Sequence, residues 1–402
     1  MNARIALGLL MLVPLCASAD DWPRWRGPEG NGISKETGWS TAWPKDGPKQ
    51  LWKAAVGTGF SAVTVANGRV FTLGNTNETD TVFCFEEGSG KELWKYSYPC
   101  ALDPKYYEGG PGSSATCEKD RVYTFSKRGH LFCFDAARGK VIWQTNLLDG
   151  LGVKKPEWGF AGSPVVEGNL LLLNVGEAGT AVDKNTGRVI WTSGKDMAGY
   201  ATPVLYNSGS ERLALIFSSG ALVGVSAKKG KEHFRFPWVE RWHINAVDPI
   251  LSGNRVFIST FGKGCALLEM RGGSTPNVVW ENENMGNHFN SCVLVNGYIY
   301  GVNGNTDKAE KDFRCLALAD GSVKWSYSGL GLGSVTVAEN KLIILSDRGE
   351  LMVAEASAET LKPIARAQVL GGKCWTVPVL ANGRIYCRNA QGTLVCLDVR
   401  GS

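Results

Sequence analysis

Short apolar runs of strand length, separated by turn residues, occupy most of the chain. Residues 131–143 (LFCFDAARGKVIW) are the clearest example. The first four residues are all apolar, so both faces of a strand formed by them would be apolar, which predicts a strand packed on both faces. The D-x-x-x-G that follows predicts an Asx-type turn with glycine where φ is positive, and the Trp begins another strand. Each stretch follows a small residue, a Pro and two apolar runs joined by a tight turn, as in residues 163–172, which predicts a hairpin.

This unit recurs at nearly constant intervals along the chain. Complete copies, with a small residue, an acid, a Gly and a Trp at fixed spacing, begin at Cys84, Cys133 and Ala181. Incomplete copies begin at Gly224 (Phe234 replaces the Trp), Cys315 (no acid) and Cys396 (cut off by the end of the sequence). The units open at Ser61, Ser113, Ser163, Thr202, Asp248, Ser291, Ser334 and Val377, which lie 39 to 52 residues apart. Eight such units of four short strands each predict an all-β fold, an eight-bladed β-propeller.

The two ends of the sequence predict how the ring closes. The last unit stops before its Trp-bearing strand, and residues 47–57 (GPKQLWKAAVG) form an isolated copy of that strand. We therefore expect Leu51–Val56, with Trp52, to complete the eighth blade, so that residues 51–402 form the propeller. Residues 20–50 are rich in Trp, Pro and Gly without periodicity, which indicates an ordered arm laid across the ring.

Residues 1–19 are typical of a signal peptide. A single Arg4 precedes an apolar stretch, and Ala17-Ser18-Ala19 offers a cleavage site. This predicts a secreted or periplasmic protein, and Cys16 leaves lipidation open as an alternative. The apolar stretch is shorter than the roughly 20 residues that span a bilayer, and no later segment approaches that length.

Charge and cysteine content narrow the possible functions. The net charge of +5 is small, and the basic residues are scattered through turns, which argues against nucleic-acid binding. Four of the ten cysteines that follow the signal peptide (Cys84, Cys133, Cys315 and Cys396) occupy the small, buried repeat position, so we interpret them as packing residues. Among the others, Cys100 with Cys117 and Cys374 with Cys387 are the first pairs to consider as disulfides. No Cys/His cluster has zinc spacing, so we expect no metal site.

The repeat resembles the tryptophan-docking motif of the pyrroloquinoline quinone (PQQ)-like β-propellers. That superfamily contains quinoprotein alcohol dehydrogenases and the non-enzymatic propeller BamB, and the first and last segments of the chain resemble secreted planctomycete-type members. The resemblance implies a structural ring formed by Trp52, Trp94, Trp143, Trp191, Trp280 and Trp325. Resemblance to the quinoproteins would also imply a bound PQQ, which is capped by a disulfide between adjacent cysteines and accompanied by a calcium ion held by Glu and Asn. Because no two cysteines are adjacent here, we expect neither cofactor and assign no catalytic residue.

Polar and aromatic residues precede the first strand of several blades, where propeller loops line the mouth of the channel. The candidate ligand-binding residues are Tyr106, Tyr107, Glu108, Glu157, Trp158, Phe160, Trp242, His243, Asn245, Asn287, His288 and Asn290. Such groups suit a sugar, a peptide or a metal ion. The alternative is that they satisfy one another around a channel filled with water.

Three functions are consistent with the sequence. We favour a non-catalytic, monomeric scaffold, secreted or periplasmic, that binds protein or cell-envelope components through its loops, as in outer-membrane assembly. The second is a module that binds a glycan or small ligand at the aromatic mouth. The third is a PQQ- and calcium-dependent quinoprotein dehydrogenase. A propeller fold alone does not choose among these functions.

Overall fold

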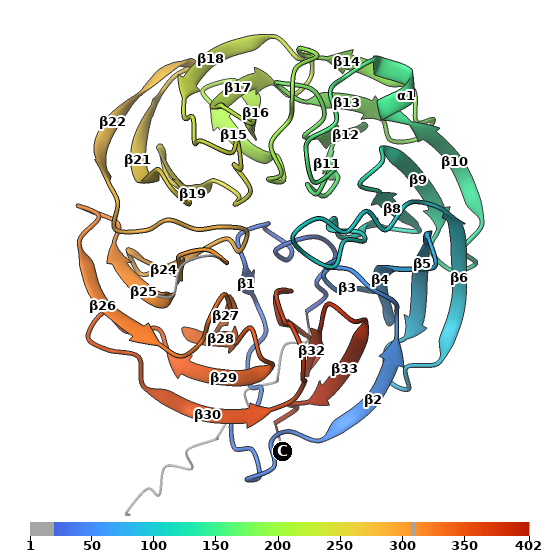
Figure 1. Ribbon diagram of the computed structural model, residues 1–402, viewed down its shortest axis with the longest axis vertical. Helices are drawn as coiled ribbons and strands as arrows, with labels where there is room; N and C mark the ends of the chain where they lie inside the picture. The colour runs from blue at the N-terminus through green and yellow to red at the C-terminus, as the bar shows by residue number, and fades with distance from the viewer. Residues whose placement is uncertain (1–19, 307–310, 402) are drawn as a thin grey trace, which may run out of the picture.

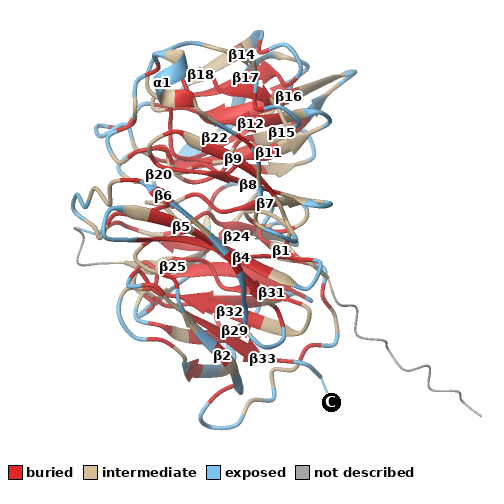
Figure 2. Cartoon of the chain, turned by 90° about the vertical axis from the view of Figure 1, so that its right-hand side faces the viewer, coloured by how far each residue is buried: buried red, intermediate tan, exposed pale blue. Residues whose placement is uncertain are grey.

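Eight antiparallel sheets form a closed ring in the computed structural model, which describes residues 20–306 and 311–401 (Figure 1). This confirms the predicted all-β, eight-bladed propeller. The helix α1 (Leu147–Leu151), capped by Asn146, joins blades 2 and 3. Figure 2 shows buried residues running through the strands, whereas exposed residues gather in the loops. The predicted signal peptide and Cys16 lie outside the described residues.

The strands follow the repeats in order. Blades 1 to 3 contain β3 (Thr64–Ala66), β4 (Arg69–Thr76), β5 (Thr79–Glu86) and β6 (Glu92–Pro99); β7 (Thr116–Glu118), β8 (Arg121–Phe125), β9 (His130–Asp135) and β10 (Val141–Asn146); and β11 (Val165–Glu167), β12 (Leu170–Leu173), β13 (Thr180–Asp183) and β14 (Val189–Thr192). Blades 4 and 5 contain β15 (Val204–Ser208), β16 (Glu211–Phe217), β17 (Ala221–Ser226) and β18 (Glu232–Pro237); and β19 (Ile250–Ser252), β20 (Arg255–Thr260), β21 (Gly264–Arg271) and β22 (Ser274–Asn282). Blades 6 to 8 contain β23 (Val293–Val295), β24 (Tyr298–Asn303), β25 (Asp312–Ala317) and β26 (Val323–Ser328); β27 (Ser334–Ala338), β28 (Lys341–Leu345), β29 (Glu350–Glu355) and β30 (Pro363–Gln368); and β31 (Val379–Ala381), β32 (Arg384–Arg388) and β33 (Thr393–Asp398).

An N-terminal strand closes the ring, as predicted. β2 (Gln50–Ala55) pairs antiparallel with β33 and is the fourth strand of blade 8. Trp52 lies opposite Cys396, in the same register that places Trp94 opposite Cys84 in blade 1. The first and last parts of the sequence therefore share one sheet.

The arm formed by residues 20–49 crosses one end of the ring, which we call the lower face. Its strand β1 (Ile33–Ser34) adds parallel to β27 as a fifth strand of blade 7, and Trp22 forms a bridge with Val65 of blade 1. On the far side, the Trp25 indole donates to Asp248 Oδ2 at 2.6 Å, and Arg26 Nε lies 3.8 Å from the same oxygen. The arm thus ties blades from opposite parts of the ring together.

Tryptophans join neighbouring blades at six of the eight junctions. The indole N–H of each donates to a carbonyl of the next blade at 2.9–3.1 Å. The donors are Trp52, Trp94, Trp143, Trp191, Trp280 and Trp325, and the acceptors are Glu87, Ala136, Lys184, Ala227, Leu318 and Ser357. At the first five of these junctions the indole also packs on a turn glycine of positive φ. The motif therefore requires glycine at this position, because a side chain would both strain the backbone and collide with the indole.

The remaining two junctions lack this contact. Phe234 takes the Trp position between blades 4 and 5, and Ala365 takes it between blades 7 and 8. At the second of these the arm substitutes in part. The backbone N–H of Ser40 donates to the Val399 carbonyl at 2.7 Å, and Trp39 is buried in the core between blades 7 and 8.

A glycine substitution tests the importance of this stacking. A methyl group added to Gly139 (φ +67°) would lie 2.5 Å from the Trp94 ring, whereas one added to Gly68 (φ +72°) meets nothing within 4 Å. Gly68→Ala should therefore cost only the left-handed backbone penalty, about 1–2 kcal/mol. Gly139→Ala should cost a further ~1–3 kcal/mol from overpacking. Chemical denaturation measures both, and equal midpoints for the two variants would contradict the stacking role.

The ten cysteines among the described residues are free thiols and nearly all are buried. The candidate pairs, Cys100 with Cys117 and Cys374 with Cys387, are therefore not bonded in this structure. Burial raises the pKa of Cys100 and of Cys374 to about 12. These side chains pack as small apolar groups within the blade interfaces.

Candidate functional site

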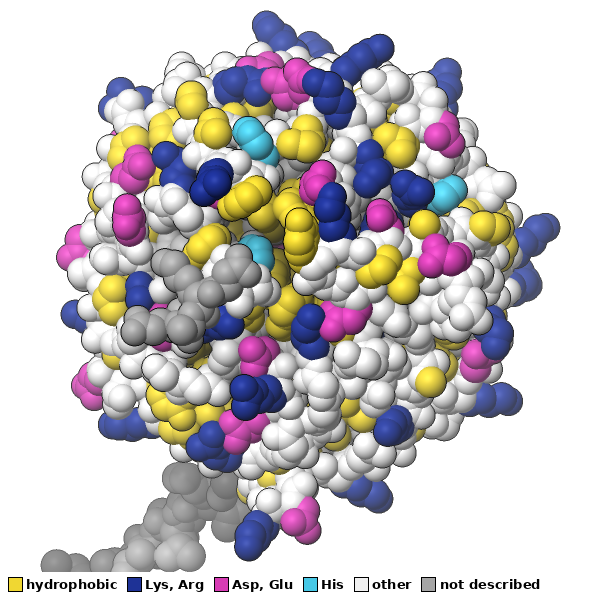
Figure 3. Space-filling view, in the orientation of Figure 1, with side chains coloured by type: hydrophobic (Ala, Val, Ile, Leu, Met, Phe, Trp, Pro, Cys, Tyr) yellow, Lys and Arg dark blue, Asp and Glu magenta, His cyan; other side chains and the backbone are white. Residues whose placement is uncertain are grey.

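The end of the ring opposite the arm, which we call the upper face, carries the loops that lead from the outer strand of one blade to the inner strand of the next. Figure 3 shows this face: hydrophobic side chains gather around the hollow at the centre, and charged side chains of both signs surround them. The predicted site residues belong to four of these loops, β6–β7, β10–β11, β18–β19 and β22–β23.

Aromatic side chains from four blade junctions meet at the channel mouth. We call Phe60, Tyr107, His288, Phe289 and Trp375 the mouth cluster. Phe60 stacks on Trp375 with ring centroids 5.7 Å apart and contacts Tyr107 at 5.5 Å. Phe289 contacts Trp375 at 4.5 Å and His288 at 4.9 Å. These contacts form a continuous series of rings that runs from the junction of blades 1 and 2 to the junction of blades 5 and 6.

Two lysines complete the cluster. Lys373 Nζ lies 4.3 Å from the centroid of Trp375 and pairs with Glu108 at 2.9 Å. Lys127 Nζ lies 5.6 Å from the centroid of Tyr107 and donates to the carbonyls of Leu102 and Asp103 at 3.1 and 3.2 Å. Burial lowers the pKa of Lys127 and raises the pKa of Tyr107 to about 12. Each of the two lysines thus lies over an aromatic ring of the mouth.

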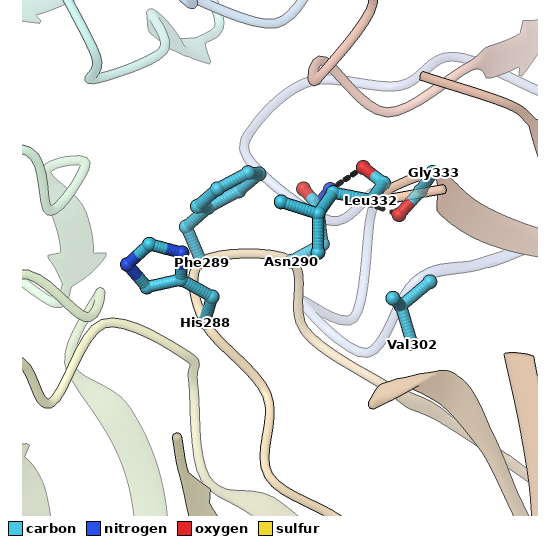
Figure 4. Close-up of a pocket in the computed structure, with 6 residues that line it drawn as sticks. All are labelled: His288, Phe289, Asn290, Val302, Leu332 and Gly333. Carbon is cyan, nitrogen blue, oxygen red and sulfur yellow. Dashed lines mark hydrogen bonds between the residues drawn. The ribbon is translucent and has the colours of Figure 1, made fainter. Parts of the chain in front are cut away.

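Three asparagines of the predicted site stabilise the loops internally. Asn245 is fully buried and donates to the carbonyls of Ser218 and Trp238 at 2.7 and 3.0 Å. Asn287 is also buried and donates to the Val302 carbonyl at 2.7 Å. Asn290 donates to the carbonyls of Leu332 and Gly333, whereas His288 points away from it (Figure 4). The cavity beside Asn290 measures about 10 Å³, which is room for one water molecule at most.

The β10–β11 loop does not reach the mouth cluster with the residues predicted for it. Phe160 is buried against Phe125, with centroids 5.3 Å apart. Trp158 contacts Tyr200 at 5.9 Å, and Glu157 pairs with Lys105. These side chains fix the loop to the neighbouring blades.

Two aromatic residues of the predicted site face outward. Tyr106 is 90% exposed and Trp242 is 58% exposed, and both belong to loops of the upper face. His243, beside Trp242, is exposed and has a left-handed backbone with φ of 56°. The twelve predicted residues thus divide into members and neighbours of the cluster, internal anchors and outward-facing side chains.

The sequence interpretation missed five residues of the mouth. Phe289 lies between the predicted His288 and Asn290, in the same loop. Phe60 and Trp375 immediately precede the first strands of blades 1 and 8, so the positional rule that found the others applies to them as well. Lys373 lies two residues before Trp375, so the same positional rule applies to it. Lys127 lies in the β8–β9 turn, where nothing in the sequence distinguishes it from other turn lysines.

With this geometry the chain is a propeller of the PQQ-like repeat superfamily. The family described as "Outer membrane protein assembly factor BamB" matches residues 78–327, more than half of the sequence, and the chain belongs to that family. None of the curated proteins matches the sequence.

Solved structures share the fold at low sequence identity. BamB from Moraxella catarrhalis has a TM-score of 0.65 and 12% identity, over 87% of this chain and 99% of that one. A europium-containing methanol dehydrogenase has a TM-score of 0.72 and 11% identity, over 92% and 90%. The quinohemoprotein alcohol dehydrogenase from Comamonas testosteroni has a TM-score of 0.66 and 15% identity, over 96% and 82%. At these identities the likeness shows the fold alone.

The residues at the mouth do not fit a quinone with calcium. A flat quinone would need a free aromatic ring on which to stack. The ring of Trp375 is already in contact with Phe60, Phe289 and Lys373. Calcium requires several free oxygen ligands, but Glu108 is paired with Lys373. Within residues 20–306 and 311–401, no three His, Cys, Asp or Glu side chains group closely enough to hold a metal. We therefore assign none of these residues a role in binding PQQ or calcium.

Proposed function

We propose that the chain is a scaffold that binds a protein partner through the loops of its upper face. The observation that carries this proposal is the exposure of Tyr106 and Trp242 on loops whose backbones are fixed. The family to which the chain belongs bears the name of an outer-membrane protein assembly factor, which supports a partner in the cell envelope.

The loop that carries Trp242 is held by a buried carboxylate. Glu240 is 5% exposed, and its Oε2 accepts from the backbone N–H groups of Trp242 and Ile244 at 2.8 and 3.4 Å. The two ends of the loop are anchored in neighbouring blades: Asn245 donates to the Ser218 carbonyl of blade 4, and the Trp238 indole donates to Thr260 of blade 5. Arg241 lies over the indole of Trp242 at 4.9 Å. The loop therefore presents Trp and Arg in one arrangement before any partner arrives.

The loop that carries Tyr106 is similarly anchored. The backbone N–H of Leu102 donates to Glu78 Oε2 at 3.0 Å, and Gly110 donates to the Leu102 carbonyl at 2.8 Å. Lys127 holds the same loop from within through the carbonyls of Leu102 and Asp103. Tyr106 itself has a positive φ of 64°, which turns it out of the loop.

The residue types at these tips are those that dominate protein interfaces. Trp, Tyr and Arg carry much of the binding free energy in hot spots, and fixed loops lose little entropy on association. A glycan or small ligand is the weaker alternative, since the mouth cluster is packed on itself and its adjacent cavity has room for only one water.

Site-specific photo-crosslinking tests the proposal. A photoreactive residue at position 106 or 242 should yield a discrete adduct with one envelope protein in cell extracts. The same group at Ile142 or Ile190, which are 45% and 42% exposed on the outer strands, should yield none. Adducts of equal yield from all four positions would contradict docking through the upper face.

We further propose that the protein acts outside the cytoplasm, as the predicted signal peptide implies. Among the described residues, no helix has the length and apolar character needed to cross a membrane. Proteolysis of intact and osmotically shocked cells, followed by detection of this chain, locates it. Protection from protease after osmotic shock would contradict this location.

A further inference from the structure

A groove of about 650 Å³ lies between blades 7 and 8, near their outer strands. The lining residues are Gln50, Lys53, Gln368–Gly372, Asn389, Gln391, Thr393 and Val395. They come from the end of β30, the β32–β33 turn and the paired strands β2 and β33. The volume falls in the range of about 300–1,000 Å³ that is typical of ligand sites.

The groove exists because small residues replace large ones at repeat-equivalent positions. Between blades 1 and 2, Tyr96 and Tyr98 pack on Phe132, with centroids 5.5 and 4.7 Å apart. Register relates Ala365 to Trp94, since the two pair with Val353 and Cys84 respectively. Val369 therefore takes the position of Tyr98.

The same register identifies the residue on the facing blade. Val395 precedes Cys396 as Phe132 precedes Cys133, so a valine stands where blade 2 has a phenylalanine. The arm covers the lower part of this junction: Trp39 is buried there, and Gly47 lies against Ala367. The upper part, above the half-buried Val369 and the buried Val395, remains open as the groove.

The lining has unused hydrogen-bonding capacity and one cation. Within the described part of the chain, the side chains of Gln50, Gln391 and Thr393 have no hydrogen-bond partner, and Lys53 has no carboxylate partner. Neither an acidic nor an aromatic residue lines the groove. Asn389 is already used, since it donates to the Gly371 carbonyl at 2.8 Å and accepts from the N–H of Thr393.

We propose that this groove binds an extended peptide segment of a partner protein that carries a carboxylate. Side-chain amides can both donate to and accept from peptide groups, and Lys53 supplies the complementary charge. The half-buried Val369 offers apolar contact. β30 is the last strand of its sheet, and an unpaired edge can accept an extended segment. A sugar would find no ring to stack on.

This site is separate from the proposed docking surface of the upper face, and variants can isolate it. Val369→Tyr places the ring found between blades 1 and 2 at the half-buried position that follows β30 and should fill the groove without loss of thermal stability. Displayed random heptapeptides, selected on the wild-type protein and counter-selected on this filled variant, should enrich acidic sequences. The Trp242→Ala, Tyr106→Ala protein should enrich the same sequences, so failure at one site does not imply failure at the other.

Synthetic peptides then allow the binding affinity to be measured. An enriched peptide should bind the filled variant at least about tenfold more weakly than wild type, a difference that corresponds to loss of its contact area. Changing its Glu to Gln should weaken binding by about fivefold, the effect of an exposed ion pair, and Lys53→Gln should abolish that difference. Failure to enrich any peptide specific to the open groove, enrichment without acidic residues, or binding of neutral maltotetraose in place of peptide would overturn the proposal.

Discussion

Removal of residues 20–56 will give an insoluble chain or an open ring. The deletion takes away β2, so β33 keeps only β32 as a partner and becomes the unpaired edge of a three-stranded blade 8. It also removes Trp52, which is 7% exposed, donates to the Glu87 carbonyl at 2.9 Å and packs on Gly90 of blade 1. Sedimentation and thermal melting of the purified truncation measure the result. A soluble truncation that melts like the full chain would contradict closure by the N-terminal strand.

A point substitution separates this closure from the bulk of the deletion. Trp52→Ala should lower the free energy of unfolding by about 3–5 kcal/mol, as for a buried Trp in a core. Ile142→Ala is the control: it is 45% exposed on β10 and should change stability by about 0.5 kcal/mol or less. If the two variants unfold alike, the Trp52 contact does not hold blade 8 to blade 1.

The second large effect is expected where the arm meets blade 5. Asp248→Ala should cost about 3–5 kcal/mol, because it leaves Arg26 buried without its carboxylate. Both side chains are 5% exposed, and burial raises the pKa of Asp248 against the opposing effect of Arg26. The substitution also removes acceptors for the Trp25 indole and for the backbone N–H of Thr202.

A double-mutant cycle isolates the ion pair from these hydrogen bonds. Arg26→Met combined with Asp248→Ala should be less destabilised than the sum of the single variants, since neither charge is then buried alone. Denaturant unfolding of the four proteins measures the coupling free energy. Additive effects would show that the pair does not join the arm to the ring.

The repeat spacing allowed the ring and its closure to be predicted from sequence. A motif such as Cys133-x-Asp135-x-x-x-Gly139-x-x-x-Trp143 specifies a strand, a turn and a staple through local geometry, and eight copies leave one ring architecture. The isolated strand around Trp52 could be matched to the incomplete last unit for the same reason.

The candidate site was less predictable because position in a loop does not fix the direction of a side chain. Asn245 and Trp242 lie three residues apart in one loop, yet Asn245 is fully buried and Trp242 is 58% exposed. Their difference depends on Glu240, whose bonds to the loop backbone appear only in three dimensions. The missing Trp of blade 7 was visible in the sequence, but the groove depends on how far the arm covers that junction.

Titration with PQQ and Ca²⁺ is the most direct test of the central claim that this propeller binds a partner and performs no quinone chemistry. The purified full-length protein is mixed with both and assayed for alcohol- or sugar-dependent reduction of a dye. We predict no saturable turnover and no quenching of tryptophan fluorescence by the quinone, because Phe60, Phe289 and Lys373 already contact Trp375. Saturable turnover that requires both PQQ and Ca²⁺ would contradict the scaffold function.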